Sequence, residues 1–192
     1  MKKHFKKRCV FLDRDGVINK PIIIKNKPYA PKNNKQFQIF NEIIPLLKKI
    51  CELDFILVVI TNQPDISTKE ITTDQVNYFH NLISNQIPIS KFYVCKHIAK
   101  HQCSCRKPKS GLTNDAIRDF NIEPKASYFI GDRWSDIDLA NNIGCFSIFI
   151  DYNYDEKLKT KPKKIVKSSK EACELILSLE GKNLCKSETY LT

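Results

Sequence analysis

Two carboxylates near the start of the chain have the type and spacing that phosphoryl transfer needs. Asp13 and Asp15 lie two positions apart in the segment 11–16, and Gly16 follows them. A carboxylate can attack phosphorus directly and form an aspartyl phosphate. A second carboxylate on the same loop can protonate the leaving oxygen and then deprotonate the attacking water. The pattern also fits a solvated acidic turn, so its interpretation depends on which other groups reach this place.

Two later segments carry groups that suit a phosphate. Thr61 and Asn62 offer a hydroxyl and an amide to a phosphate oxygen, and they follow an apolar run. Arg106 and Lys107 precede an expected helix and can neutralise charge on the transferring group. Asn62 and Arg106 are candidates for substrate binding, whereas Thr61 and Lys107, each taken singly, fit ordinary loop residues better.

A third carboxylate segment favours a divalent cation. Asp132 follows an apolar run, and its carboxylate suits Mg²⁺, which prefers oxygen ligands in octahedral geometry. We expect Asp13, Asp132 and the carbonyl oxygen of Asp15 to hold Mg²⁺. Asp136 fits two roles equally, a carboxylate near the metal and a residue that matches the dipole at a helix start.

Four potential ligands for zinc fall within eleven residues. Cys95, His97, Cys103 and Cys105 share one polar loop, and thiolates with imidazole suit tetrahedral Zn²⁺. Four protein ligands leave no position for water, so the expected role of the zinc is structural. His101 lies between the two pairs and could replace His97, but we favour His97.

Apolar runs alternate with helical patterns along the chain, which predicts an α/β fold with a parallel sheet. Ligands of such sheets bind beyond the carboxyl ends of the strands. The expected strands are 9–12, 55–60, 91–94, 127–130 and 146–150, and the expected helices are 41–51, 73–84, 111–120, 135–143 and 171–179. The polar segment 20–38 is expected to be a long functional loop.

Composition fits one folded domain. The chain has 192 residues, of which 42% are hydrophobic. We expect a single domain over 1–180 and a flexible tail over 181–192. No apolar run is long enough to span a bilayer, and the stretch after the basic start is too short for a secretion signal. A cytoplasmic enzyme is therefore the expectation.

The order of these motifs resembles the haloacid-dehalogenase (HAD) superfamily of phosphohydrolases, over about residues 10–154. That resemblance implies a three-layer, Rossmann-like fold with helices on both faces of the sheet. It also implies that Asp13 is the nucleophile and Asp15 the acid/base. Thr61 and Lys107 would then stabilise the phosphoryl group, and Asp132 would complete the Mg²⁺ site.

The zinc loop directly before Arg106 narrows the resemblance to the branch (subfamily IIIA) of histidinol-phosphate and heptose 1,7-bisphosphate phosphatases. This branch has no large cap domain, and loops select the substrate. The short spacing of the zinc ligands is similar to the histidinol-phosphate members. Five other segments are similar to the heptose-bisphosphate members: 27–31, 61–65, 107–112, 131–134 and 150–154.

The charge of the substrate is a second criterion for choosing between the two phosphatase activities. A sugar bisphosphate needs cations for its second phosphate, whereas histidinol phosphate carries an ammonium that needs a carboxylate. The loops supply six cations: Lys20, Lys25, Lys27, Arg106, Lys109 and Arg133. Of these, we add Arg133 to the expected substrate-binding residues. Pro64 and Asp65 depart from the Ser-Gly of many relatives, and proline has no N–H for a phosphate.

A phosphatase of a sugar bisphosphate such as D-glycero-D-manno-heptose 1,7-bisphosphate, in surface-polysaccharide precursor synthesis, is the leading hypothesis. A histidinol-phosphate phosphatase is the alternative. The formal charge of +11 and the Cys/His cluster keep a zinc-bearing nucleic-acid-binding module as a remote alternative. We expect a small phosphorylated metabolite as partner, no specific nucleic acid, no membrane, and a monomer or weak homo-oligomer.

Overall fold

Six parallel strands form the centre of the computed structural model, in the order β5-β4-β1-β6-β7-β8. The structure describes the backbone of residues 6–188 and the side chains of residues 6–181. The strands are β1 (Arg8–Leu12), β4 (Phe55–Asn62), β5 (Ile89–Cys95), β6 (Tyr128–Gly131), β7 (Phe146–Ile150) and β8 (Lys164–Val166).

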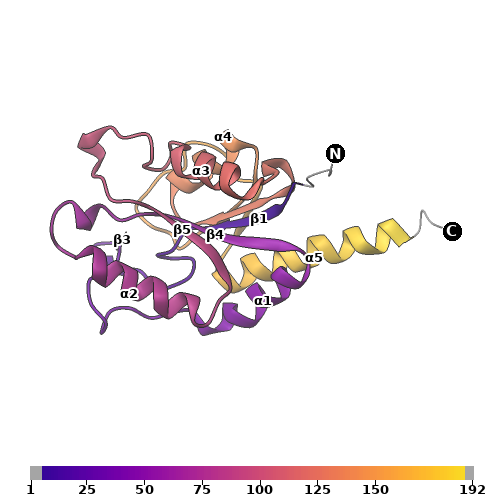
Figure 1. Ribbon diagram of the computed structural model, residues 1–192, viewed down its shortest axis with the longest axis horizontal. Coiled ribbons are helices and arrows are strands. Elements are labelled where there is room, and N and C mark those ends of the chain that lie inside the picture. The colour runs from indigo at the N-terminus through magenta and orange to yellow at the C-terminus, as the bar shows by residue number, and fades with distance from the viewer. Residues whose placement is uncertain (1–5, 189–192) are drawn as a thin grey trace.

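Helices cover both faces of this sheet, so the expected three-layer α/β fold is confirmed (Figure 1). Alternate residues of β1 are buried on opposite faces, because Val10 packs in one apolar cluster and Phe11 in the other. The helices are α1 (Ile44–Glu52), α2 (Thr73–Ser84), α3 (Gly111–Phe120), α4 (Trp134–Ile143) and α5 (Ser169–Glu188). The clusters place α1 and α5 on one face, and α3 and α4 on the other.

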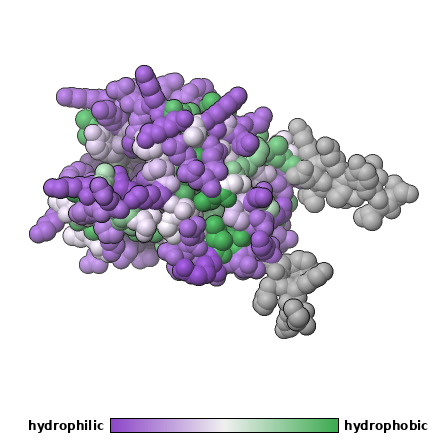
Figure 2. All heavy atoms as spheres, turned by 90° about the horizontal axis from the view of Figure 1, so that it is seen from above, coloured by the Kyte–Doolittle hydropathy of each residue, from purple (hydrophilic) through white to green (hydrophobic). Residues whose placement is uncertain are grey.

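The helices outside the sheet are amphipathic. The face seen in Figure 2, over α3 and α4, is mainly hydrophilic, with apolar side chains in small patches. In α3 the buried side chains include Leu112 and Ala116, which fits the expected stripe of that helix. No helix in residues 6–188 combines the length and the apolar character that a bilayer crossing requires.

Two strand pairings lie in segments for which the sequence indicated no strand. The segment 20–38 contains a hairpin of β2 (Ile22–Ile24) and β3 (Lys27–Tyr29), and β8 lies in the lysine-rich stretch before α5. Lys25 and Asn26 both have positive φ, as a two-residue hairpin loop requires. Lysine is not a typical residue for that conformation, and three-residue strands give little periodicity, so the sequence pattern did not reveal them.

The end of the chain also differs from the expectation. We expected a flexible tail from residue 181, but α5 continues to Glu188. Gly181 by itself does not end the helix, because one glycine in a helix interior costs only about 1 kcal/mol and no proline follows. Residues 189–192 of the expected tail lie outside the described residues.

The layer of α1 against the sheet gives a stability prediction. Leu47 is fully buried on α1, so Leu47→Ala should lower the free energy of unfolding by about 2–5 kcal/mol. Urea denaturation measures the change. Lys48→Ala, at an exposed position on the same helix, should stay within about 0.5 kcal/mol of the parent. Equal losses in both variants would contradict the packing described here.

Candidate active site

A cavity of about 570 Å³ opens at the carboxyl ends of β1, β4 and β6. The structure brings the proposed catalytic, substrate-binding and magnesium-binding residues to this one place. Its lining includes Asp13, Asp15, Thr61, Asn62, Arg106, Lys107, Asp132, Arg133 and Asp136. Parallel strands end at the same edge of a sheet, which explains why residues far apart in sequence meet here.

Lys107 is the buried cation at the floor of this cavity. Its Nζ lies 2.7 Å from Asp13 Oδ1 and 2.7 Å from Asp136 Oδ1, and it donates to the Ile60 carbonyl at 2.8 Å. Burial lowers the pKa of Lys107, but the charges of Asp13 and Asp136 more than offset this and hold the pKa above its usual value. The ammonium therefore stays charged and fixes two carboxylates.

Asp13 follows β1 and is 7% exposed. Burial raises the pKa of Asp13 to about 6, and the adjacent Lys107 charge opposes that rise. Its Oδ1 also accepts from the backbone N–H of Arg14 at 2.7 Å. One oxygen is thus held by protein donors while the carboxylate borders the cavity.

Three carboxylates can share a cation next to Lys107. One oxygen each of Asp13, Asp132 and Asp136 lie within 4.8 Å of one another. Among the described residues, neither oxygen of buried Asp132 has a hydrogen-bond partner. An unpartnered buried carboxylate is costly, and a hard cation that prefers oxygen ligands would satisfy it. These residues fit Mg²⁺.

Gly16 and Gly131 allow the carboxylates to approach the backbone closely. Gly16 has a φ of +94°, and a Cβ there would lie 2.0 Å from Asp132 Oδ2. A Cβ on Gly131 would lie 2.2 Å from the Cβ of Asp136. Both glycines are therefore required by packing against the acidic cluster, beyond any need for a sharp turn.

Asp136 combines the two roles that the sequence left open. Its Oδ2 accepts from the backbone N–H of Arg133 at 3.0 Å, at the start of α4. Its Oδ1 contacts Lys107, and the same residue belongs to the acidic cluster. Asp136 therefore orders the start of α4 and also anchors Lys107.

The three expected substrate-binding residues are each engaged by protein groups. The Asn62 side chain bonds the backbone of Lys107 on both sides, at 3.1 Å and 3.4 Å. Arg106 donates to the His97 carbonyl at 3.1 Å. Arg133 pairs with Glu156, with Nε 2.7 Å from Oε2, so its charge is already matched. Of these, Arg106 has no paired carboxylate among the described residues.

The basic residues of the long loop are not where the substrate argument placed them. The cavity lining within the described chain includes Arg106, Lys109 and Arg133 but none of Lys20, Lys25 and Lys27. Those lysines lie on or beside the β2–β3 hairpin, whose turn faces solvent.

Sequence reasoning missed the groups that surround Asp15. Arg14, Asn19 and Gln63 all donate to its carboxylate, and Gln63 also donates to Thr61 Oγ1 at 2.9 Å. The only sequence signal for these three residues was that they lie beside the Asp13/Asp15 and Thr61/Asn62 segments. Nothing in the pattern indicated that they would converge.

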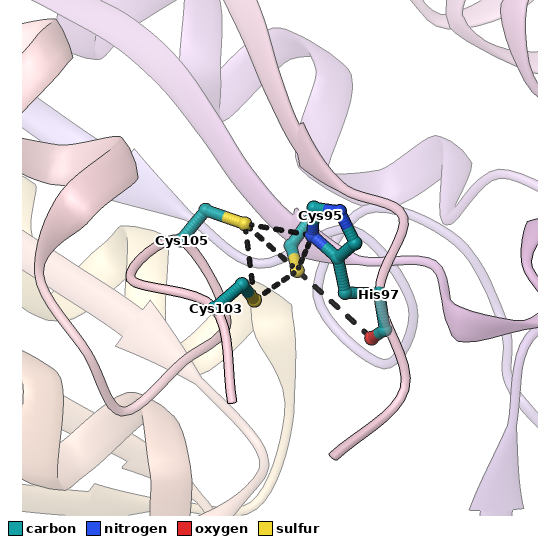
Figure 3. Close-up of side chains that lie close together, drawn as sticks. All are labelled: Cys95, His97, Cys103 and Cys105. Carbon is teal, nitrogen blue, oxygen red and sulfur yellow. Dashed lines mark hydrogen bonds between the residues drawn. The ribbon is translucent and has the colours of Figure 1, made fainter. Parts of the chain in front are cut away.

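Figure 3 shows the Cys/His cluster, whose four side chains point toward a common centre. Cys105 Sγ lies 3.2 Å from Cys95 Sγ, 3.3 Å from Cys103 Sγ and 3.2 Å from His97 Nδ1. Tetrahedral zinc with bonds of about 2.3 Å separates its sulfur ligands by about 3.8 Å, so a small expansion would admit the ion. The set contains His97 and not His101, as the sequence favoured.

The role of Asp136 gives a second prediction. Asp136→Asn removes one of the two buried carboxylates on Lys107, and the free energy of unfolding in EDTA should fall by about 3 kcal/mol. The control Asp115→Asn breaks an exposed pair with Arg118 and should cost less than about 1 kcal/mol. Chemical denaturation measures the free energy of unfolding of both variants. Similar losses for the two variants would argue against Lys107 depending on Asp136.

The sequence is similar to a known protein family and to individual phosphatases. Residues 10–172 match the family model described as polynucleotide kinase 3 phosphatase. A probable D-glycero-D-manno-heptose-1,7-bisphosphate 7-phosphatase of Thermoplasma acidophilum is 33% identical over 144 residues, 71% of this chain and 86% of that protein. A D-glycero-alpha-D-manno-heptose-1,7-bisphosphate 7-phosphatase of Mycobacterium bovis is 36% identical over 141 residues, 70% of this chain and 72% of that protein.

Two further similarities are informative. The histidine biosynthesis bifunctional protein HisB of Blochmanniella floridana is 30% identical over 148 residues, 71% of this chain but 39% of that protein. The fold is that of a D,D-heptose 1,7-bisphosphate phosphatase from B. bronchiseptica, complexed with magnesium and phosphate. Its TM-score is 0.74 at 18% identity, with 89% of this chain and 98% of that chain covered. The chain belongs to the haloacid-dehalogenase-type phosphatases, in the group related to the heptose-1,7-bisphosphate phosphatases and the HisB phosphatase domain.

Proposed function

We propose that this phosphatase hydrolyses a sugar bisphosphate of the D-glycero-D-manno-heptose 1,7-bisphosphate type through a phosphorylated Asp13. The observation that carries the proposal is the floor of the cavity. There, the buried carboxylate of Asp13, directly after β1, contacts a fixed ammonium and shares an acidic cluster with an unpartnered Asp132. Relatives at 33% and 36% identity support the substrate class.

The first half of the proposed reaction transfers the phosphoryl group to the protein. An oxygen of Asp13 attacks phosphorus as the bond to the leaving oxygen breaks, and that oxygen takes a proton from Asp15. Thr61 and Lys107 lie at the cavity and stabilise the oxygens of the transferring group. Bound Mg²⁺ would add charge neutralisation, with Asp13, Asp132 and the Asp15 carbonyl as its protein ligands.

The second half regenerates the enzyme. Asp15, now ionised, takes a proton from water as the water oxygen attacks phosphorus, and the bond to Asp13 breaks. Inorganic phosphate leaves and Asp15 carries the proton for the next cycle. Atoms and protons therefore balance with water as the only co-reactant.

The cavity walls support a second anionic group in the substrate. Arg106 and Lys109 border the cavity beside the Cys/His loop, and Lys109 donates to the Gln102 carbonyl at 2.8 Å. Both charges lack a carboxylate partner among the described residues, so a second phosphate can bind them. Arg133 contributes less, because Glu156 already balances it.

One observation favours histidinol phosphate as the second candidate. Asp65 lines the cavity, and burial raises its pKa, with Lys32 opposing that effect. A carboxylate here would suit an ammonium and would repel a second phosphate. The similarity to HisB agrees with this candidate. A zinc-bearing nucleic-acid-binding module fits this structure less well, because the Cys/His loop forms part of the cavity wall through Ala99, Gln102 and Cys103.

A substrate screen tests the proposal. With Mg²⁺ present, we expect kcat/KM to be highest for heptose 1,7-bisphosphate among sugar bisphosphates, sugar monophosphates, histidinol phosphate and a 3′-phosphorylated oligonucleotide. Asp13→Asn should lower kcat on the best substrate by at least about 10³-fold, because the attacking oxygen is lost. Asp115→Asn, at a partly exposed position on α3, serves as the control. Substantial activity in Asp13→Asn would refute the mechanism.

We propose that Cys95, His97, Cys103 and Cys105 hold one structural Zn²⁺. Elemental analysis should find one zinc per chain, and Cys103→Ser should lose it and lower Tm by about 5–10 °C. Cys51→Ser, a half-buried cysteine on α1, should retain zinc. Metal-free wild-type protein with an unchanged Cys103→Ser variant would rule out this site.

A further inference from the structure

A fully buried arginine, Arg14, stands between Asp13 and Asp15 in the sequence, and its side chain pairs with Asp15. Arg14 is 0% exposed, although burying a guanidinium is costly unless it is paired. Its Nη2 donates to both oxygens of Asp15, at 3.0 Å and 2.9 Å, and its Nε donates to Oδ1 at 3.2 Å. Arg14 has no other carboxylate partner among the described residues. Its burial is therefore tied to one particular orientation of the Asp15 side chain.

Two neutral amides complete the surroundings of Asp15. Asn19 Nδ2 donates to Oδ1 at 2.9 Å, and Gln63 Nε2 donates to Oδ2 at 2.7 Å. Five donated bonds thus converge on one carboxylate, from the turn after β1 and from the residue that follows β4. A side chain held in this way has little freedom to rotate, yet it still borders the cavity.

Arg14 is supported in turn by His80, which comes from a different element. Arg14 Nη1 lies 3.5 Å from His80 Nε2 on α2. Arginine can only donate, so this contact requires an unprotonated Nε2. Burial and the adjacent Arg14 charge lower the pKa of His80 to about 3, which keeps the ring neutral.

The His80 ring is itself fixed. It stacks on Phe92 of β5 with ring centroids 4.2 Å apart and an interplanar angle of 13°. In the described part of the chain, His80 is buried and lies outside the lining of the cavity, so it cannot touch a substrate there. A buried neutral histidine in this position has no role in the mechanism proposed above.

We propose that His80, Arg14 and Gln63 are positioning residues for Asp15, and that His80 on α2 acts through Arg14 to aim that carboxylate at the leaving oxygen. The inference rests on the proposed function, because it assumes that Asp15 handles the proton of the leaving group. It adds a support that spans α2 and β5, outside the four sequence motifs.

Substrates with different leaving groups can distinguish a misplaced Asp15 from a general loss of structure. An alkoxide leaving group needs a proton as its bond to phosphorus breaks, whereas p-nitrophenolate leaves without one. The value of kcat/KM reports steps up to that bond cleavage. A misdirected Asp15 should therefore harm the hydrolysis of an alkyl phosphate more than that of p-nitrophenyl phosphate.

The variant His80→Phe keeps an aromatic ring beside Phe92 and removes the acceptor for Arg14. With heptose 1,7-bisphosphate, kcat/KM should fall by about tenfold, whereas with p-nitrophenyl phosphate it should change by less than about twofold. His80→Gln restores an acceptor and should recover most of the loss. Phe79→Leu, at a neighbouring buried position on α2, should lower Tm and leave the ratio of the kcat/KM values for the two substrates unchanged.

Crystal structures of the wild type and His80→Phe provide a readout that needs no activity. We expect Arg14 to shift and the Asp15 carboxylate to rotate in the variant. Unmoved Arg14 and Asp15 side chains, or equal losses of kcat/KM on both substrates, would overturn the inference. If the wild type hydrolyses no phosphomonoester, the proposed function fails, and the crystal comparison then decides the positioning role by itself.

Discussion

The contact between Lys107 and two buried carboxylates is the interaction on which the site depends. A buried ammonium without partners is strongly unfavourable, and Asp13, Asp136 and the Ile60 carbonyl provide the partners here. Those groups come from the end of β1, from α4 and from β4, so the contact forms only when the sheet and its helices are assembled. The same ammonium then lies where a transferring phosphoryl group would need positive charge.

Several structural features follow from placing Lys107 at that point. The Asn62 side chain binds the Lys107 backbone from both sides, which ties this loop to the end of β4. The Cys/His loop lies directly before it, and Arg106 donates to the His97 carbonyl. A metal in that loop would therefore stiffen the cavity wall that carries Arg106 and Lys109.

In the acidic cluster, the cost of burying three carboxylates is only partly offset by protein groups. Asp13 and Asp136 are matched by Lys107, whereas Asp132 has no hydrogen-bond partner among the described residues. Burial and the neighbouring Asp13 charge raise the pKa of Asp132 well above its usual range. Gly16 and Gly131 let these carboxylates pack against the backbone. Such an arrangement favours a divalent cation, because a hard cation with oxygen ligands offsets the charge of the buried carboxylates.

The sequence by itself determined the α/β class, the bounds of α2 and α3, the residues at the strand ends and the four members of the Cys/His cluster. These depend on local patterns, because burial periodicity and ligand spacing are written along the chain. Only the tertiary structure decided that His80 meets Arg14, that Glu156 pairs with Arg133, and that Lys20 lies away from the cavity. Those relations join residues from separate elements, and side-chain packing between elements leaves no periodic signal in the sequence.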